Sequence, residues 1–330
     1  MTSCGATPRI APKTYHSIVP SWDQVLAEIQ GERPVHPIDS VRRKYLRELN
    51  HYTGRNVIAY YSGWLSEARP APALNINDED KNAFMSVIKG LDRDRGLDLI
   101  LHTPGGDVAA AESLVDYLRK MFGTDIRAIV PQLAMSAGTM IACACSSILM
   151  GKQSNLGPID PQFNGIPANG VIAEFNKAVQ QIQSNPASAP LWQSIIGKYH
   201  PTFLGACENA VKWAEAIVVD WLSSGMFAED ERADNKARYV VQQLTDPSET
   251  FNHSRHIHVE TLQQMGLRIE CLEDDAMLQD LVLTVHHAYM HAFSMTRALK
   301  IVENHDSVAV VRQAAAPPNQ VQARLEASPT

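Results

Sequence analysis

The chain lacks the features that mark membrane, secreted and nucleic-acid-binding proteins. Its 330 residues contain no apolar run close to the roughly 20 residues needed to span a bilayer. Residues 1–17 lack the continuous apolar core of a signal peptide. A formal net charge of −7 leaves no basic surplus, which disfavours nucleic-acid binding. We therefore expect a cytoplasmic protein without a membrane segment and without a nucleic-acid partner.

Cysteine is also scarce. The number of cysteines is odd, and no Cys-x-x-Cys pair occurs, so a disulfide framework or a zinc–cysteine site is not expected. Two of them lie in one apolar run, where cysteine behaves as a small hydrophobic residue. We expect neither a metal nor a cofactor. The five cysteines are Cys4, Cys143, Cys145, Cys207 and Cys271.

What the chain does contain is an alternation of strands and helices. Hydrophobic residues make up 45% and charged residues 20%, an ordinary globular composition. Such alternation predicts an α/β fold with right-handed crossovers and a mainly parallel sheet. Strands are expected at 56–65, 97–103, 126–132 and 146–151, and helices at 77–91, 105–122 and the segment after Ser136.

Helical segments flank this alternating region. Two short helices, with Ser21 and Ser40 as N-cap candidates, precede it. Helices follow over 171–226, and a last helix is expected over 275–300. The sequence thus divides into an N-terminal helical extension (1–50), a main domain (51–300) and a Pro/Ala-rich tail (301–330) that we expect to be disordered.

Two motifs at neighbouring strand ends carry the chemistry. In "HTPGGDV", Gly105 and Gly106 permit positive φ and leave backbone N–H groups unobstructed. In "AMSAGT", Ser136 opens the next helix among small residues. The carboxyl ends of parallel strands meet at one edge, where ligands bind. Ser136 is then a candidate nucleophile at a helix N-terminus, and the N–H groups of Gly106 and Ala137 are a candidate oxyanion hole.

Plainer interpretations exist for both motifs. Serine is preferred as a helix N-cap for purely structural reasons. A Gly-Gly pair also serves in tight turns and in phosphate-binding turns. Composition and spacing alone leave these alternatives open.

The order of the motifs is that of a known superfamily. "LILHTPGGDVAAAESLVDYL" followed by "AMSAGTMIACAC" resembles the ClpP/crotonase superfamily of serine peptidases, and "SNLGPIDPQFNGIPANGV" resembles its serine dehydrogenase proteinase family, related to ClpP and SppA. The resemblance covers about 56–272. It implies a ClpP/crotonase-like spiral of ββα units with a mainly parallel sheet and helical additions, assembled as a homo-oligomer.

The resemblance implies a Ser–Asp–His triad on this chain. Ser136 is the nucleophile, Asp160 the orienting carboxylate and His253 the base, because "NHSRHIHVETLQQMGL" fits the family's frame with His253. Asp160, between two prolines, has the alternative of an ordinary turn residue. Three histidines within six residues depart from the family pattern, so His256 and His258 are close alternatives for the base. His200 and the helical group His286, His287 and His291 are the other candidates.

Two further basic groups were considered. His287 and His291 are four residues apart and can share a helix face, as metal ligands do. No H-E-x-x-H pattern accompanies them, which favours a helix-surface or core placement. Lys152 lies near the site in sequence but matches no SppA-like lysine motif.

The function implied is hydrolysis of peptide bonds by a serine endopeptidase through an acyl-enzyme. Its substrates are peptides or unfolded protein, with or without an ATPase partner. One alternative is a non-catalytic ClpP-like scaffold that binds in the same cleft. Another is a crotonase-type acyl-CoA enzyme, against which Ser136 argues because such enzymes need no serine nucleophile.

Overall fold

A seven-stranded sheet forms the centre of the protein. The computed structural model describes residues 21–31, 37–66, 72–245 and 252–314. The sheet consists of β1 (Asn56–Ser62), β2 (Leu97–His102), β3 (Ile126–Val130), β5 (Ser147–Met150), β10 (Ile269–Cys271), β11 (Ala298–Asn304) and β12 (Ala309–Gln313). Their order is β10-β5-β3-β2-β1-β11-β12, with the first five parallel and the last two antiparallel. The predicted α/β fold with a mainly parallel sheet is confirmed.

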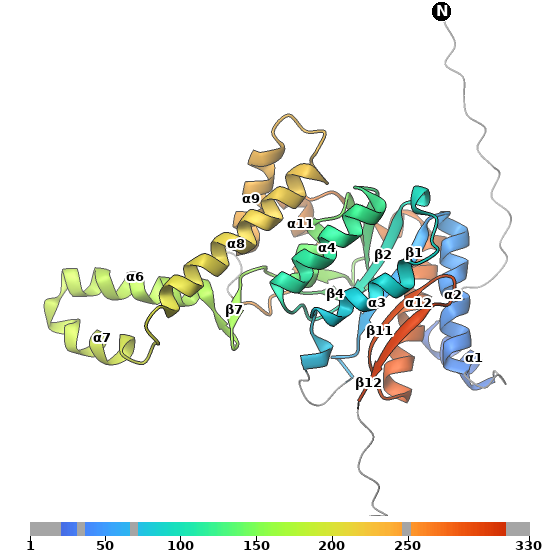
Figure 1. The fold of residues 1–330 in the computed structure, drawn as a ribbon, viewed down its shortest axis with the longest axis horizontal. Coiled ribbons are helices and arrows are strands. Elements are labelled where there is room, and N and C mark those ends of the chain that lie inside the picture. Colours follow the sequence, from blue (N-terminus) through green and yellow to red (C-terminus); the bar gives the residue numbers. More distant parts are fainter. Residues whose placement is uncertain (1–20, 32–36, 67–71, 246–251, 315–330) are drawn as a thin grey trace, which may run out of the picture.

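Helices cover both faces of this sheet (Figure 1). Every residue of β1 and β2 is buried, which explains why both strands are almost continuously apolar in sequence. One face packs against α3 (Glu79–Ile88), α4 (Val108–Phe122) and α5 (Ala137–Cys143). The other packs against α1 (Trp22–Gly31), α2 (Pro37–Thr53) and α12 (Ala276–Met295).

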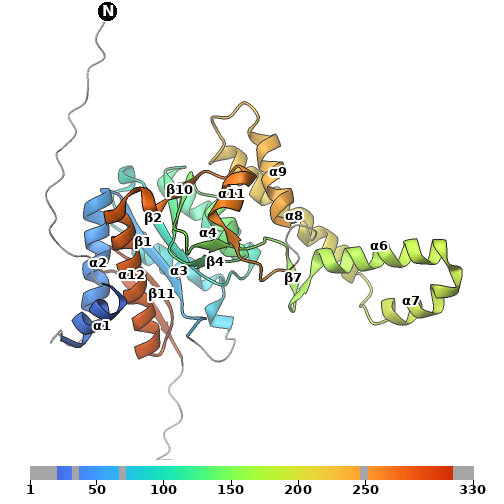
Figure 2. The ribbon, with the colours of Figure 1, turned by 180° about the vertical axis from the view of Figure 1, so that it is seen from behind.

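A helical arm projects from the body at one end (Figures 1 and 2). It consists of α6 (Ala168–Ser184), α7 (Ala189–Ile196) and the distal part of α8 (Phe203–Ser224). The other end of α8 packs against α9 (Ala233–Thr245) and joins the main core. Among the described helices, none combines the length and apolar character needed to cross a membrane.

A small second sheet brings distant loops together. It pairs β4 (Leu133–Ala134) with β6 (Asn155–Leu156), and β6 with β9 (Ile257–His258). Helix α11 (Val259–Met265) follows β9, and a hairpin of β7 (Gln162–Phe163) and β8 (Ile166–Pro167) lies between β6 and the arm. Short 3-10 turns occur at Pro72–Leu74, Arg93–Arg95, Pro186–Ser188 and Leu272–Asp274.

The C-terminal boundary predicted from sequence is wrong. The last helix ends at Met295 rather than near Lys300, and residues 298–313 form β11 and β12 instead of a disordered tail. Buried Lys300 and Glu303 interrupt the apolar pattern by which a buried strand is recognised. Residues 315–330 lie outside the described residues.

The N-terminal helices belong to the same body as the sheet. Helix α2 begins at Pro37 rather than after Ser40, in keeping with the preference for proline in a helix's first turn. Leu46 of α2 and Val25 of α1 share a buried cluster with α12 and the sheet. The predicted boundary at residue 50 therefore does not separate two cores. Residues 1–20 lie outside the part that the structure describes.

Candidate active site

Ser136 occupies a strained turn between β4 and α5. Its φ is 52° and its ψ is −120°, a conformation that costs a non-glycine residue about 1–3 kcal/mol. It stands at the N-cap position of α5, yet its side chain makes no capping hydrogen bond. The structure therefore does not use Ser136 as a cap. Within the described residues the Ser136 hydroxyl has no hydrogen-bond partner, and a strained strand-to-helix turn that presents such a serine resembles a nucleophile elbow.

The turn is fixed from both sides. The Thr139 hydroxyl donates to the Ala134 carbonyl at 2.8 Å and accepts the Gly157 N–H at 2.9 Å. A Cβ at Gly138 would lie 2.5 Å from Cγ2 of Thr103, at the end of β2. Small residues around Ser136 thus allow the turn to pack closely on the neighbouring strand end.

The Gly-Gly loop lies directly against this turn. Gly105 has φ 95°, and a Cβ there would be 2.6 Å from both Cβ of Ser136 and the Met135 carbonyl oxygen. Only glycine meets both conditions, because the conformation is left-handed and the space is filled.

A backbone bridge aims the Gly106 N–H. Ile76 donates its N–H to the Gly105 carbonyl at 2.8 Å, and its carbonyl accepts the Asp107 N–H at 3.0 Å. In such a parallel bridge the N–H of the residue between, Gly106, points away from the partner. Within the described residues, neither this N–H nor that of buried Ala137 has a hydrogen-bond acceptor. An oxyanion hole needs backbone donors that are not already bonded within the protein, and these two N–H groups meet that condition among the described residues.

Asp160 and His253 form a pair at the same end of the sheet. Nδ1 of His253 lies 2.8 Å from Oδ1 of Asp160. The carboxylate is buried, and Ile159 is anchored through its N–H to the Leu244 carbonyl at 3.1 Å. The His253 side chain keeps 20% of its surface exposed. Oδ1 is an acceptor in this contact when Nδ1 carries its hydrogen, and Nε2 is then the ring nitrogen left for another partner.

One cavity, of about 630 Å³, brings most of these groups together, although buried Ala137 is not among the residues that line it. Ser136, Asp160, His253, Gly105 and Gly106 line it together. Its remaining walls come from the Asn75–Ile76 segment, from α4, from the β7 region and from α8. Those residues are Asn75, Ile76, Pro104, Asp107, Val108, Ile159, Pro161, Gln162, Phe163, Ala210 and Trp213.

The other candidate bases lie elsewhere. His256 and His258 are exposed, and His258 is in β9. His200 lies on the arm, with Nδ1 against the carbonyl of the adjacent Pro201. None of the three lines the cavity that holds Ser136. Of the candidate bases, His253 is the histidine that lines the same cavity as Ser136.

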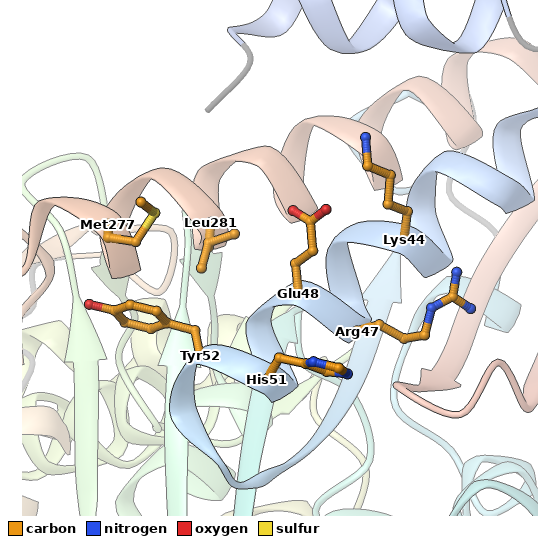
Figure 3. Close-up of a pocket in the computed structure, with 7 residues that line it drawn as sticks. All are labelled: Lys44, Arg47, Glu48, His51, Tyr52, Met277 and Leu281. Carbon is orange, nitrogen blue, oxygen red and sulfur yellow. The ribbon is translucent and has the colours of Figure 1, made fainter. Parts of the chain in front are cut away.

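A second cavity, of about 550 Å³, lies between α2 and α12 (Figure 3). Its side chains are mostly basic or apolar, and no described residue that lines it is a serine, threonine or cysteine. The hydroxyl in this lining is that of Tyr52, which donates to the Asp275 carboxylate at 2.9 Å. The lining residues are Lys44, Arg47, Glu48, His51, Tyr52, Met277 and Leu281.

Cys143, Cys145 and His291 do not line the cavity that holds Ser136. Burial raises the pKa of the Cys143 and Cys145 thiols to about 12, so neither is a thiolate at neutral pH. Nε2 of His291 lies 3.1 Å from the Trp22 carbonyl oxygen, a contact between helices. Among the described residues, no three His, Cys, Asp or Glu side chains group as metal ligands would.

Two parts of the site were not found from sequence. The Asn75–Ile76 segment follows a short 3-10 turn and carries no motif, although it supports the Gly-Gly loop. Ala210 and Trp213 reach the cavity from α8, and no motif distinguishes them in the sequence. The Asn75–Ile76 segment and the two α8 residues reach the site through long-range packing, which local sequence patterns do not reveal.

A mainly parallel sheet, with a strained serine turn beside a Gly-Gly loop at its edge, defines a ClpP-like α/β protein. The chain belongs to the family described as ClpP-like SDH-type serine proteinase, whose family model matches residues 35–283. The family predicted from the motifs is thereby confirmed.

Two relatives are uncharacterized proteins of Methanocaldococcus jannaschii. MJ0137 is 32% identical over 195 residues, which cover 59% of this chain and 60% of the relative. MJ1495 is 27% identical over 232 residues, which cover 69% of this chain and 71% of the relative. The chain thus spans less than two thirds of the length of MJ0137.

Proposed function

We propose that this protein is a serine peptidase that hydrolyses peptide bonds through an acyl-enzyme on Ser136, with Asp160 and His253 completing the triad. The observation that carries the proposal is that the Ser136 side chain, which makes no capping hydrogen bond, shares one cavity with the hydrogen-bonded His253–Asp160 pair. A strained serine, a base and a carboxylate at one site are the components of nucleophilic acyl transfer.

The geometry supports the following sequence of proton transfers. Nε2 of His253 takes the proton of Ser136 as the oxygen attacks the substrate carbonyl carbon. Asp160 holds the imidazole through Nδ1 and stabilises its charged form. The N–H groups of Gly106 and Ala137 donate to the oxyanion. His253 then passes the proton to the leaving amine, and water hydrolyses the acyl-enzyme with the same base.

The cavity walls favour apolar peptide segments. Phe163 and Trp213 contribute apolar surface, and Trp213 is 42% exposed. Two carboxylates, Asp107 and Asp160, lie in the lining, and no described lining residue is lysine or arginine. Peptides or unfolded protein with exposed apolar side chains are therefore the substrates we propose, rather than acidic ones.

The test is peptide hydrolysis by four variants. We expect Ser136→Ala to lose on the order of 10⁴-fold in kcat, and Asp160→Asn and His253→Gln to lose much of the activity. His256→Gln is the matched control, because His256 is exposed and outside the cavity. Hydrolysis that survives Ser136→Ala, or that falls equally in His256→Gln, contradicts the proposal.

We also propose a homo-oligomer located in the cytoplasm. The distal arm has a small buried cluster centred on Ala168, Val171 and Cys207, and it exposes Val179 and Leu191. Because the buried cluster of the arm is small, its exposed apolar side chains favour contact with a second copy of the chain. The buried free thiols suit a reducing compartment. Analytical ultracentrifugation tests the assembly, and Leu191→Asp is expected to weaken it. A wild-type chain that sediments as a monomer contradicts this part.

A further inference from the structure

A buried ion pair joins the last part of the chain to α3. Lys300 of β11 is 1% exposed and Asp80 of α3 is 2% exposed. Nζ of Lys300 lies 2.8 and 2.9 Å from the two carboxylate oxygens of Asp80. It also donates to the Asn75 carbonyl at 2.7 Å. An ammonium group has three donors, so all of them are used within the protein.

Asp80 is held by two further donors. The Tyr60 hydroxyl donates to Oδ2 at 2.8 Å, and the Asn77 N–H donates to the same oxygen at 3.0 Å. Burying two charges costs several kcal/mol per ion, and such a pair is often no more stabilising than apolar residues of equal volume. Stability alone therefore does not account for this pair.

The network holds the residues on both sides of Ile76. Lys300 binds the carbonyl of Asn75, and Asp80 binds the N–H of Asn77. Ile76 between them makes the two backbone hydrogen bonds that aim the Gly106 N–H. The contact is close, since a Cβ at Gly106 would lie 2.4 Å from the Ile76 nitrogen. Any displacement of Ile76 is thus transmitted to Gly106.

We propose that Lys300 and Asp80 are positioning residues that fix the oxyanion-hole donor Gly106 through Ile76. The inference rests on the proposed peptidase function for its catalytic consequence. Lys300 is not a candidate base, because its donors are all bound and it does not line the cavity. A reacting group misplaced by 1 Å loses about 10²-fold in rate, so a remote support of this kind matters.

Glu303 provides a matched control. It lies on the same strand, is fully buried, and pairs with Arg42 and Arg43 on the opposite face of the sheet. Lys300→Met removes the ion pair with Asp80, and Glu303→Gln removes the ion pairs with Arg42 and Arg43. Of these two residues, only Lys300 bonds to the Asn75–Asn77 segment. Both variants are compared with the wild-type chain at a temperature where circular dichroism shows all three folded.

Two readouts separate positioning from stability. The first is hydrogen exchange of the Ile76 and Asp107 amides, which does not depend on catalysis. We expect faster exchange at both amides in Lys300→Met and wild-type exchange in Glu303→Gln. The second is peptide hydrolysis, in which Lys300→Met lowers kcat by about tenfold or more with KM within about threefold, while Glu303→Gln keeps kcat.

Further variants keep the test decisive if Lys300→Met unfolds. Tyr60→Phe removes one hydrogen bond to Asp80, and we expect faster exchange at Ile76 with a kcat about two- to fivefold lower. Lys300→Met combined with Asp80→Asn removes the unpaired charge and restores stability. We expect its kcat to stay low, because the Asn75 carbonyl still lacks the hydrogen bond from Lys300.

The inference is overturned if hydrogen exchange is unchanged in Lys300→Met, in Tyr60→Phe and in the double variant, or if kcat recovers with stability in the double variant. If Ser136→Ala hydrolyses peptides like the wild type, the proposed function fails while exchange still tests the positioning.

Discussion

Nδ1 of His253 lies 2.8 Å from Oδ1 of Asp160, although 93 residues separate the two in sequence. The pairing of β6 with β9 brings their segments together, and the pairing of β4 with β6 adds the segment of Ser136. A three-stranded sheet of two-residue strands thus assembles the candidate triad at the edge of the large sheet.

The carboxylate of Asp160 should matter for rate and little for folding. We expect Asp160→Asn to lower kcat by about 10²–10⁴-fold with little change in KM, because an amide no longer holds the productive imidazole tautomer. Steady-state kinetics measures this. Asp116→Asn is the control, since Asp116 is exposed on α4 outside the cavity. Equal kcat in the two variants would show that Asp160 is only a turn residue.

Gly105 should be intolerant of any side chain. We expect Gly105→Ala to lower kcat at least 10²-fold, because its Cβ would displace the Ser136 turn. Gly90 has φ 90°, close to the 95° of Gly105, but a Cβ there meets nothing within 4 Å. Gly90→Ala is therefore expected to cost about 1 kcal/mol of stability and no activity. Comparable losses of kcat would mean that backbone strain, rather than the contact with Ser136, explains the effect.

Trp213 should set a preference for bulky apolar side chains. We expect Trp213→Ala to lower kcat/KM about tenfold for peptides with large apolar residues and much less for alanine-rich peptides. Tyr239 of α9 is also exposed and aromatic but lies outside the cavity, so Tyr239→Ala should leave the preference unchanged. A peptide-library profile of both variants measures it, and an unaltered profile in Trp213→Ala would contradict this role.

Buried histidines should make the fold acid-sensitive. Burial and His286 lower the pKa of His102 well below its ordinary value, and burial lowers that of His286 to about 3. Unfolded imidazoles titrate near 6.5, so the unfolded chain binds more protons at lower pH. The contribution of these histidines to the free energy of unfolding is therefore fully present above about pH 6.5. It falls as the pH decreases, by up to about 1.4 kcal/mol per pH unit for each histidine.

His102→Leu tests this directly. Among the described residues, neither buried ring nitrogen of His102 has a hydrogen-bond partner. An apolar side chain of similar size should therefore raise the free energy of unfolding by about 1–3 kcal/mol at pH 7. The free energy of unfolding of His102→Leu should also decrease less between pH 7 and pH 5 than that of the wild-type chain. Chemical denaturation at both pH values is the measurement. A variant that is less stable at pH 7 and equally acid-sensitive would be inconsistent with an unsatisfied buried imidazole.

Sequence patterns predicted the parts of the site that depend on local structure. Gly105 and Ser136 each follow a strand end, and the parallel arrangement brings strand ends to one edge. The choice of His253 came from family resemblance, because nothing local distinguishes it from exposed His256. Strand β11 was missed because Lys300 and Glu303 look incompatible with a buried strand until their partners Asp80 and Arg42 are known. Those partners lie more than 200 residues away.

The central claim is that Ser136 is a nucleophile activated by His253. Labelling with a fluorophosphonate probe, followed by mass spectrometry of the digested protein, tests it most directly. We predict one adduct, on Ser136, that is absent in Ser136→Ala, much slower to form in His253→Gln and unchanged in His256→Gln. Failure of the wild-type chain to react, or an adduct that persists in Ser136→Ala, would contradict the account.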